Sequence, residues 1–155
     1  MKYFILLGAL LLPVLPAFAD DFVYLKCENQ MKLTSTEIKT GKLINDGETK
    51  FETVFLKIDP VGSRFMSYKP SSDNKEPNWD DATIAGGVLS ATMVDKTEAL
   101  EVNGEISVEF EPAGKLSSQL SAIAFGIIST QIEITGHCVD EVRSVFEKAF
   151  KAPDD

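Results

Sequence analysis

The sequence contains few of the residues that most catalytic and metal sites require. It has one histidine, His137, and two cysteines, Cys27 and Cys138. It contains no CxxC or HExxH motif, no GxSxG nucleophile motif and no Gly-rich phosphate loop. A Ser-His-Asp triad would have to use His137, and this histidine with the two cysteines makes a poor zinc site. No catalytic residue, cofactor or metal is therefore predicted.

Apolar runs are equally scarce, and the only long one lies at the N-terminus. Lys2 precedes apolar residues 4–15, and Ala17-Phe18-Ala19 matches the small-x-small cleavage pattern. The run contains Pro13 and is too short to cross about 30 Å of hydrocarbon. Residues 1–19 are therefore predicted to be a cleaved signal peptide. We expect export, to the periplasm if the source is bacterial or else by secretion, without membrane insertion after cleavage.

Clusters of basic residues are absent as well. The 155-residue chain carries a net charge of −9, which falls to −10 when Lys2 is removed with the signal peptide. Nucleic acids and anionic membrane surfaces would be repelled, so neither is expected as a partner. An unknown small molecule or protein remains. Residues 20–151 have the length of a single domain, and residues 152–155 are expected to form a frayed tail.

The two cysteines belong to segments with strand periodicity. Residues 129–138 alternate between apolar and polar side chains, and this places Cys138 on the apolar side and His137 on the polar side. Residues 22–29 alternate in the same way and place Cys27 on the apolar side. In an exported chain, this arrangement predicts a buried disulfide between Cys27 and Cys138.

Further β-segments are predicted along the chain, with several irregular features between them. Residues 59–62 suit a type I turn. Gly86-Gly87 predicts a bend inside a central strand. Asn103-Gly104 predicts a hairpin with a three-residue loop at 102–104, because this register keeps the apolar residues on one face. Residues 115–121 are expected to be helical or irregular before a strand begins. The predicted strands besides the two cysteine segments are 31–38, 51–59, 64–68, 84–94, 106–110 and 122–127.

The pattern changes at the C-terminus, where residues 139–150 place apolar side chains on one stripe at helical spacing. Acidic residues lie near the start of this segment and lysines near its end, as the helix dipole favours. The predicted fold is mainly β. An antiparallel sheet of seven or eight strands is closed or nearly closed into a small barrel or sandwich, and one C-terminal amphipathic helix packs on it.

The longest predicted loop, residues 69–81, contains the only tryptophan. Such loops carry binding residues more often than the scaffold does. A Ca²⁺ ion held by Asp73, Asn78, Asp80 or Asp81 does not fit an EF-hand, because Lys75 and Pro77 fall where ligands belong. The alternative to a ligand-binding loop is a polar loop whose single tryptophan packs against the fold. We therefore expect Trp79 to be mostly buried. The candidate ligand-contact residues are Asp73, Asn78, Trp79, Asp80 and Asp81.

The two ends of the chain resemble a known group of proteins. Tyr24-Leu25-Lys26-Cys27 in the first strand and Gly136-His137-Cys138 in the last, followed by a Phe-containing terminal segment, are similar to small exported bacterial β-rich proteins of unassigned function. These proteins have one cysteine near each end of the mature chain. The resemblance implies the fold layout and the disulfide, and it carries no catalytic residue.

Two functions are compatible with these observations. The first is a non-enzymatic binding or interaction module, in which the sheet encloses or displays an apolar surface for a small molecule or protein. The alternative is a cell-envelope hydrolase that uses carboxylates of the 73–81 loop, which would require two of them to converge in a cleft.

Overall fold

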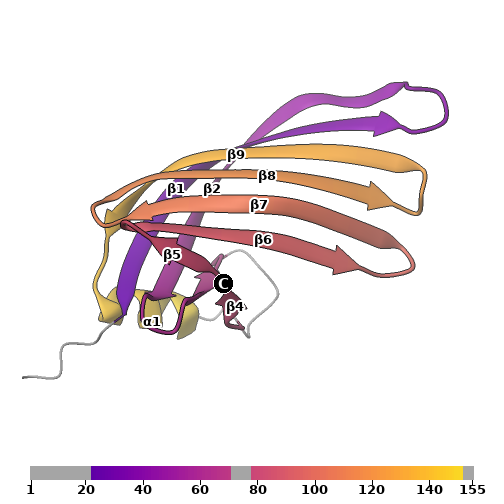
Figure 1. Ribbon diagram of the computed structural model, residues 1–155. Coiled ribbons are helices and arrows are strands. Elements are labelled where there is room, and N and C mark those ends of the chain that lie inside the picture. The colour runs from indigo at the N-terminus through magenta and orange to yellow at the C-terminus, as the bar shows by residue number, and fades with distance from the viewer. Residues whose placement is uncertain (1–21, 71–77, 152–155) are drawn as a thin grey trace, which may run out of the picture.

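The fold consists of one curved antiparallel sheet and a C-terminal helix (Figure 1). The computed structural model describes residues 22–70 and 78–151. The predicted signal peptide and the tail at 152–155 lie outside these ranges. The elements are β1 (Val23–Glu37), β2 (Leu43–Asp59), β3 (Arg64–Tyr68), β4 (Asp80–Asp81), β5 (Thr83–Ala85), β6 (Val88–Lys96), β7 (Leu100–Phe110), β8 (Ala113–Ala124), β9 (Ile128–Asp140) and α1 (Arg143–Lys151).

The sheet is a meander that almost closes on itself. Its strand order is β4-β3-β2-β1-β9-β8-β7-β6-β5, so that every strand pairs with its neighbour in sequence except β4 with β5. These two short strands form the edges, and Ala82 alone connects them along the chain. The first and last long strands, β1 and β9, pair with each other over 13 residue positions. The predicted fold class, an antiparallel sheet closed or nearly closed into a barrel or sandwich with one C-terminal helix, is confirmed in its barrel-like form, with nine strands in place of seven or eight.

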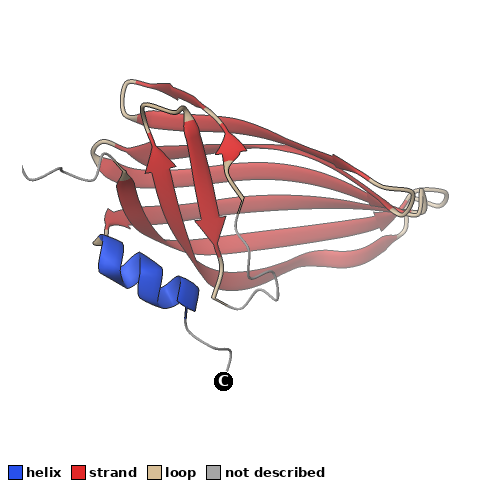
Figure 2. Ribbon diagram, turned by 90° about the horizontal axis from the view of Figure 1, so that it is seen from below, coloured by secondary structure: helices blue, strands red, loops and turns tan. Residues whose placement is uncertain are grey.

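The strands differ greatly in length, and this divides the sheet into two ends. β1 and β2 have 15 and 17 residues, whereas β3, β4 and β5 have five, two and three. Figures 1 and 2 show the long strands continuing well past these short ones. We call the part enclosed by β3–β5 the closed end. The open end comprises residues 30–51, 91–106 and 118–134. Among the described residues, the 81–83 segment reaches only its inner part, near residues 91–92, 105–106 and 118–119.

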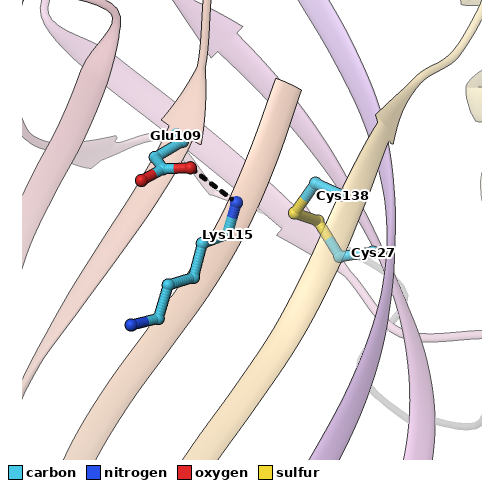
Figure 3. The surroundings of a disulfide bond; sticks show 4 residues. All are labelled: Cys27, Glu109, Lys115 and Cys138. Atoms are coloured by element: carbon cyan, nitrogen blue, oxygen red, sulfur yellow. Dashed lines mark hydrogen bonds between the residues drawn. A yellow bond between two sulfur atoms is a disulfide. The ribbon is translucent and has the colours of Figure 1, made fainter. Parts of the chain in front are cut away.

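The main core lies inside the closed end. Leu25, Ile58, Leu89 and Val108 are fully buried there, together with both cysteines. Cys27 and Cys138 are direct partners on β1 and β9, with their Cα atoms 4.0 Å apart, and they form the predicted disulfide (Figure 3). The bridge links the two strands where the sheet would otherwise depend on hydrogen bonds alone.

A second apolar layer covers the other face of the closed end. Helix α1 places Phe146 against Tyr24, with ring centroids 5.6 Å apart, and Phe150 edge-on to Tyr68 at 5.5 Å. Phe55 is buried in the same cluster, which explains why β2 is apolar on both faces here. The helix begins at Arg143, later than predicted, because β9 continues to Asp140 in a ladder with β1.

The predicted hairpin at Asn103-Gly104 is wrong. Both residues lie inside β7, where Gly104 pairs with Met93 and Leu120. A Cβ atom at Gly104 would lie 2.3 Å from Leu120 Cδ2, so the glycine provides space for packing. The chain turns earlier, between β6 and β7, where the Leu100 amide donates to Thr97 Oγ1 at 3.0 Å.

Two further predictions are corrected. Gly86-Gly87 is the turn between edge strand β5 and β6, and not a bend inside one central strand. Both glycines have positive φ, 58° and 77°, as a tight two-residue hairpin requires. Residues 115–121 belong to β8, which pairs on both sides. The four-residue spacing of Leu116 and Leu120 suggested a helix, but an even spacing also places two residues on one side of a strand.

Candidate binding site

The loop residues selected from the sequence do not converge. Asp73 lies outside the described residues, and Asn78 is exposed. Asp80 and Asp81 are exposed neighbours in β4, opposite Phe65 and Arg64 respectively, so their side chains project to opposite sides. Within residues 22–70 and 78–151, no group of three or more His, Cys, Asp or Glu side chains could hold a metal ion.

Trp79 packs on the outside of the closed end. Its ring lies 5.8 Å from that of Phe22, and the Arg64 guanidinium lies 4.5 Å above it. Lys57, which shares the outward face of β2 with Phe55, is 5.5 Å from the same ring. The tryptophan is partly buried and is not among the side chains of the main core. It therefore supports β2 and β3 from outside and does not plug the barrel.

A different site emerges from the strand registers. Along β1, β9, β8, β7 and β6, the face that bears the core at the closed end stays mostly apolar through the open end. These side chains are only partly buried, and Leu100 is 40% exposed. We call this surface the apolar trough. It consists of Met31, Leu33, Met93, Leu100, Val102, Ile106, Leu120, Ala122, Ala124, Ile128, Ile132 and Ile134.

The trough is continuous across the strands. Leu33 is the register partner of Ile132, which in turn pairs with Leu120, and Leu120 reaches over Gly104. Five strands at their usual spacing give a width of about 19 Å, and six residues along β9 give a length of about 20 Å. Polar side chains also lie on this face. Ser35 Oγ is hydrogen-bonded to Thr130 Oγ1 at 2.9 Å, and Asp95 on β6 is exposed. On β2, beside Met31 and Leu33, Lys50 and Glu48 form an ion pair at 3.3 Å.

The opposite face of the same strands is polar. Its side chains are exposed, as expected for a surface that faces water. A sheet with one polar and one apolar face normally carries a second layer on the apolar face, and the closed end has one. At the open end the described residues supply no such layer. The exposed polar residues include Gln30, Lys32, Thr92, Asn103, Glu105, Gln119, Gln131, Glu133 and Thr135.

Two polar side chains mark the boundary between the trough and the closed end. Asn29 on β1 and Glu52 on β2 are direct register partners on the trough side of the sheet. Asn29 is 5% exposed, and its Oδ1 has no hydrogen-bond partner. Glu52 accepts from Lys69 Nζ at 2.7 Å through Oε2, whereas its buried Oε1 has no partner. Each residue therefore has one buried acceptor without a partner, and Asn29 Oδ1 lies against Gly136 of β9, on the side of β1 away from Glu52.

A cleft of about 570 Å³ lies nearby, where the segment 81–83 passes β6, β7 and β8. Its lining includes Ala91 and Ile106, which share the trough face, and Ser118. Ser118 Oγ donates to the Glu105 carbonyl at 2.8 Å, so this hydroxyl is already satisfied. The volume is within the range of small-molecule sites.

The chain matches no protein-family model, no curated protein and no solved structure. The resemblance to small exported bacterial proteins therefore stays a prediction. No helix in the described ranges is long and apolar enough to span a membrane. The fold and the site alone define the class: a small curved-sheet protein, closed by a core at one end and open over an apolar trough at the other.

The strands that carry the trough are unusually long. The long strands have 11 to 17 residues, except for β6 with nine, whereas five or six is usual. The failed hairpin at Asn103 and the misassigned residues 115–121 concealed this length.

Proposed function

We propose that this protein is an exported, non-enzymatic binding module that holds an elongated apolar ligand in the trough. The observation that carries the proposal is the trough itself, an apolar sheet face about 20 Å long that the described residues leave uncovered. Contiguous apolar surfaces of this size mark binding sites in soluble proteins.

The energetics of the surface support a ligand with an apolar chain. Burial of apolar area contributes about 25 cal/mol per Å², so a chain lying along the trough gains stability over its whole length. The side chains come from five adjacent strands, so the ligand would meet a preformed surface. Preformed sites avoid much of the ordering cost of binding.

Export is supported by the sequence pattern at residues 1–19 and by the disulfide. Disulfides form and persist in the periplasm and outside the cell, and are rare in the cytosol. Apolar molecules in such aqueous compartments require a carrier or a membrane. The net charge of −9 and the polar outer face would keep a carrier dispersed there.

The alternative function, a hydrolase using carboxylates of the 73–81 loop, has no observation in its favour. Asp80 and Asp81 diverge, and the binding hypothesis uses features that the hydrolase hypothesis leaves unexplained. It stays a prediction, and we do not develop it.

The test is titration of the exported protein with Nile red, a neutral dye that fluoresces in apolar surroundings. We expect saturable binding to the native protein. Ile132→Glu places a charge in the trough and should weaken binding at least about tenfold, or about 1.4 kcal/mol. The matched control is Gln131→Glu, which places the same charge on the polar face one residue away and should bind like the wild type.

Circular dichroism and thermal melts of both variants establish that they fold. Absence of saturable dye binding to the native protein, or equal losses in the two variants, would show that the trough is not the binding surface.

A further inference from the structure

We infer that the tips of three hairpins form a docking surface for a zwitterionic lipid bilayer. This inference goes beyond the proposed function and does not depend on it. The β1–β2, β6–β7 and β8–β9 turns, with the strand residues next to them, comprise residues 38–44, 97–100 and 125–127. We call this surface the apolar rim. Its exposed apolar side chains are Ile38, Leu43, Ile44, Leu100, Phe125 and Ile127.

The first step is that the three turns lie together. Figures 1 and 2 both place them at the opposite end of the sheet from α1. Backbone hydrogen bonds connect neighbouring turns. The Ile38 amide donates to the Ile127 carbonyl at 2.8 Å, and the Phe125 amide donates to the Ala99 carbonyl at 2.7 Å. The rim is therefore one surface held by the sheet, and not three independent loops.

The second step is the amount of apolar surface. The six rim side chains are between 40% and 73% exposed. They are half of the twelve large apolar side chains that are exposed among the described residues, although the rim has only 14 residues. Apolar residues scattered singly over a protein surface are normal, whereas a contiguous group marks an interaction site.

Phe125 shows that the rim is not explained by folding alone. Its φ is 51°, in the left-handed region that suits Gly or Asn and is strained for a bulky side chain. Its side chain is 73% exposed, so packing offsets little of this strain. Strained residues cluster at functional sites. A phenyl ring at the tip of a hairpin is well placed to enter an apolar phase.

The third step is charge. The rim contains Lys39, Lys42 and Glu98, a net charge of +1, whereas the whole chain carries −9. Lysine side chains lay their stems along apolar surface and carry the ammonium group outward to polar surroundings. The two lysines lie between Ile38 and Leu43 in sequence, so they can reach lipid phosphates while the apolar side chains enter the bilayer. The acidic remainder of the chain disfavours an anionic bilayer, and this leaves a zwitterionic one.

The shape of the rim favours a bilayer over a protein partner. A stable protein interface buries about 800 Å² on each partner against a complementary surface. The rim instead presents three narrow turns, and a fluid lipid surface adapts to such tips without shape complementarity. Leu100 belongs to both the rim and the apolar trough, so docking would place the open end of the trough at the membrane surface.

The experiment is flotation of the exported protein with phosphatidylcholine vesicles, whose head groups are zwitterionic. We expect the native protein to float with the vesicles. A higher salt concentration should not release it, because salt screens charges and does not weaken the burial of apolar side chains. Release by salt would show that charge drives the binding and would overturn the inference.

Phe125→Asn should weaken vesicle binding at least about tenfold, because it removes the most exposed apolar side chain of the rim. Asparagine adopts positive φ more readily than phenylalanine, so the thermal stability of this variant should equal or exceed that of the wild type. The matched control is Val61→Gln in the β2–β3 turn of the closed end, where the valine is 85% exposed. It should bind vesicles like the wild type, and an equal loss in both variants would overturn the inference.

The outcomes separate this inference from the proposed function. Phe125 and Val61 lie outside the trough, so both variants should bind Nile red like the wild type when no vesicles are present. Nile red binding without vesicle binding overturns the docking surface and leaves the binding module standing. Vesicle binding without Nile red binding does the reverse. A dimer in sedimentation velocity that Phe125→Asn abolishes would show that a second copy covers the rim, and this would overturn the inference.

Discussion

Leucines on the same face of the same strand are buried at the closed end of the sheet and partly exposed at the open end. Leu25 and Leu33 share one face of β1, yet Leu25 is fully buried and Leu33 is partly exposed. Leu116 and Leu120 show the same contrast on β8. The alternation decides which face a side chain occupies, and the opposing wall decides whether that face is buried. Stability should therefore reside at the closed end and ligand binding at the open end.

The largest difference between the ends should follow from removing the disulfide. The bridge spans 111 residues, and the chain-entropy argument with measured precedents gives a loss of about 3–5 kcal/mol for Cys27→Ala with Cys138→Ala. Urea unfolding of the oxidised wild type and the double variant measures it. The comparison pair, Ser35→Ala with Thr130→Val, breaks a contact between the same two strands at the open end and should cost about 1 kcal/mol. Similar losses of unfolding free energy for the two double variants would contradict the view that stability resides mainly at the closed end.

The next prediction compares the two leucines of β1. Leu25→Ala should lower the free energy of unfolding by about 3 kcal/mol, because it leaves a cavity in a closed core. Leu33→Ala removes the same atoms from a partly exposed face and should cost about 1 kcal/mol. Chemical denaturation of both variants gives the two values, and a larger loss for Leu33 would mean that the open end is a core.

Substitution of Gly136 tests how tightly Asn29 packs against β9 where the closed end meets the trough. Gly136→Ala brings a Cβ atom against Asn29 Oδ1 and to 2.9 Å from the Glu28 carbonyl, so overpacking should cost about 1–3 kcal/mol. Adding Asn29→Ala should restore part of this loss, because the closer of the two clashes disappears. Thermal melts of the single and double variants check it. A double variant less stable than both singles would show that the amide and the glycine do not share this space.

Trp79→Ala should have a smaller effect, about 1–2 kcal/mol. The tryptophan is partly buried and makes one ring contact with Phe22 and cation–π contacts with Arg64 and, at longer range, Lys57, each worth about 0.5–1.5 kcal/mol. The measurement is urea unfolding, with iodide quenching of the native fluorescence to establish exposure. A loss above about 3 kcal/mol would place the ring in the core after all.

The smallest effect concerns pH at the β2–β3 turn. The Gly62 amide and Arg64 Nε both donate to the Asp59 carboxylate at 2.8 Å, and these contacts hold the pKa of Asp59 below its usual value. Since the folded pKa lies below the unfolded value of about 3.9, this contribution is present above pH 4 and disappears as the pH falls through the folded pKa.

The Tm difference between wild type and Asp59→Asn should therefore shrink as the medium is acidified below about pH 4. Glu105→Gln on the polar face of the open end serves as the control. A difference that grows on acidification would have the wrong sign for a depressed carboxyl pKa.

The sequence was sufficient for features that depend on local alternation. The strand at residues 129–138, the buried face of both cysteines and the amphipathic C-terminal helix follow from period-2 or period-3.6 patterns. The turn at 59–62 follows from its proline and glycine. Features that depend on what lies opposite could not be predicted in this way. The glycines at 86–87 and 104 exchange their predicted roles because one needs positive φ and the other needs space under Leu120. The trough was missed for the same reason, since no local pattern shows that a second layer is absent.

The disulfide joins the first and last strands of a meander, and this makes the chain between Cys27 and Cys138 a covalent circle. A single protease cut anywhere inside that circle would leave both fragments attached, and they would separate only when the bridge is reduced. The nicked molecule would retain the strand neighbours on either side of the cut. This protein is expected to work outside the cytosol. There, a first cleavage in an exposed hairpin would leave both the closed end and the trough assembled.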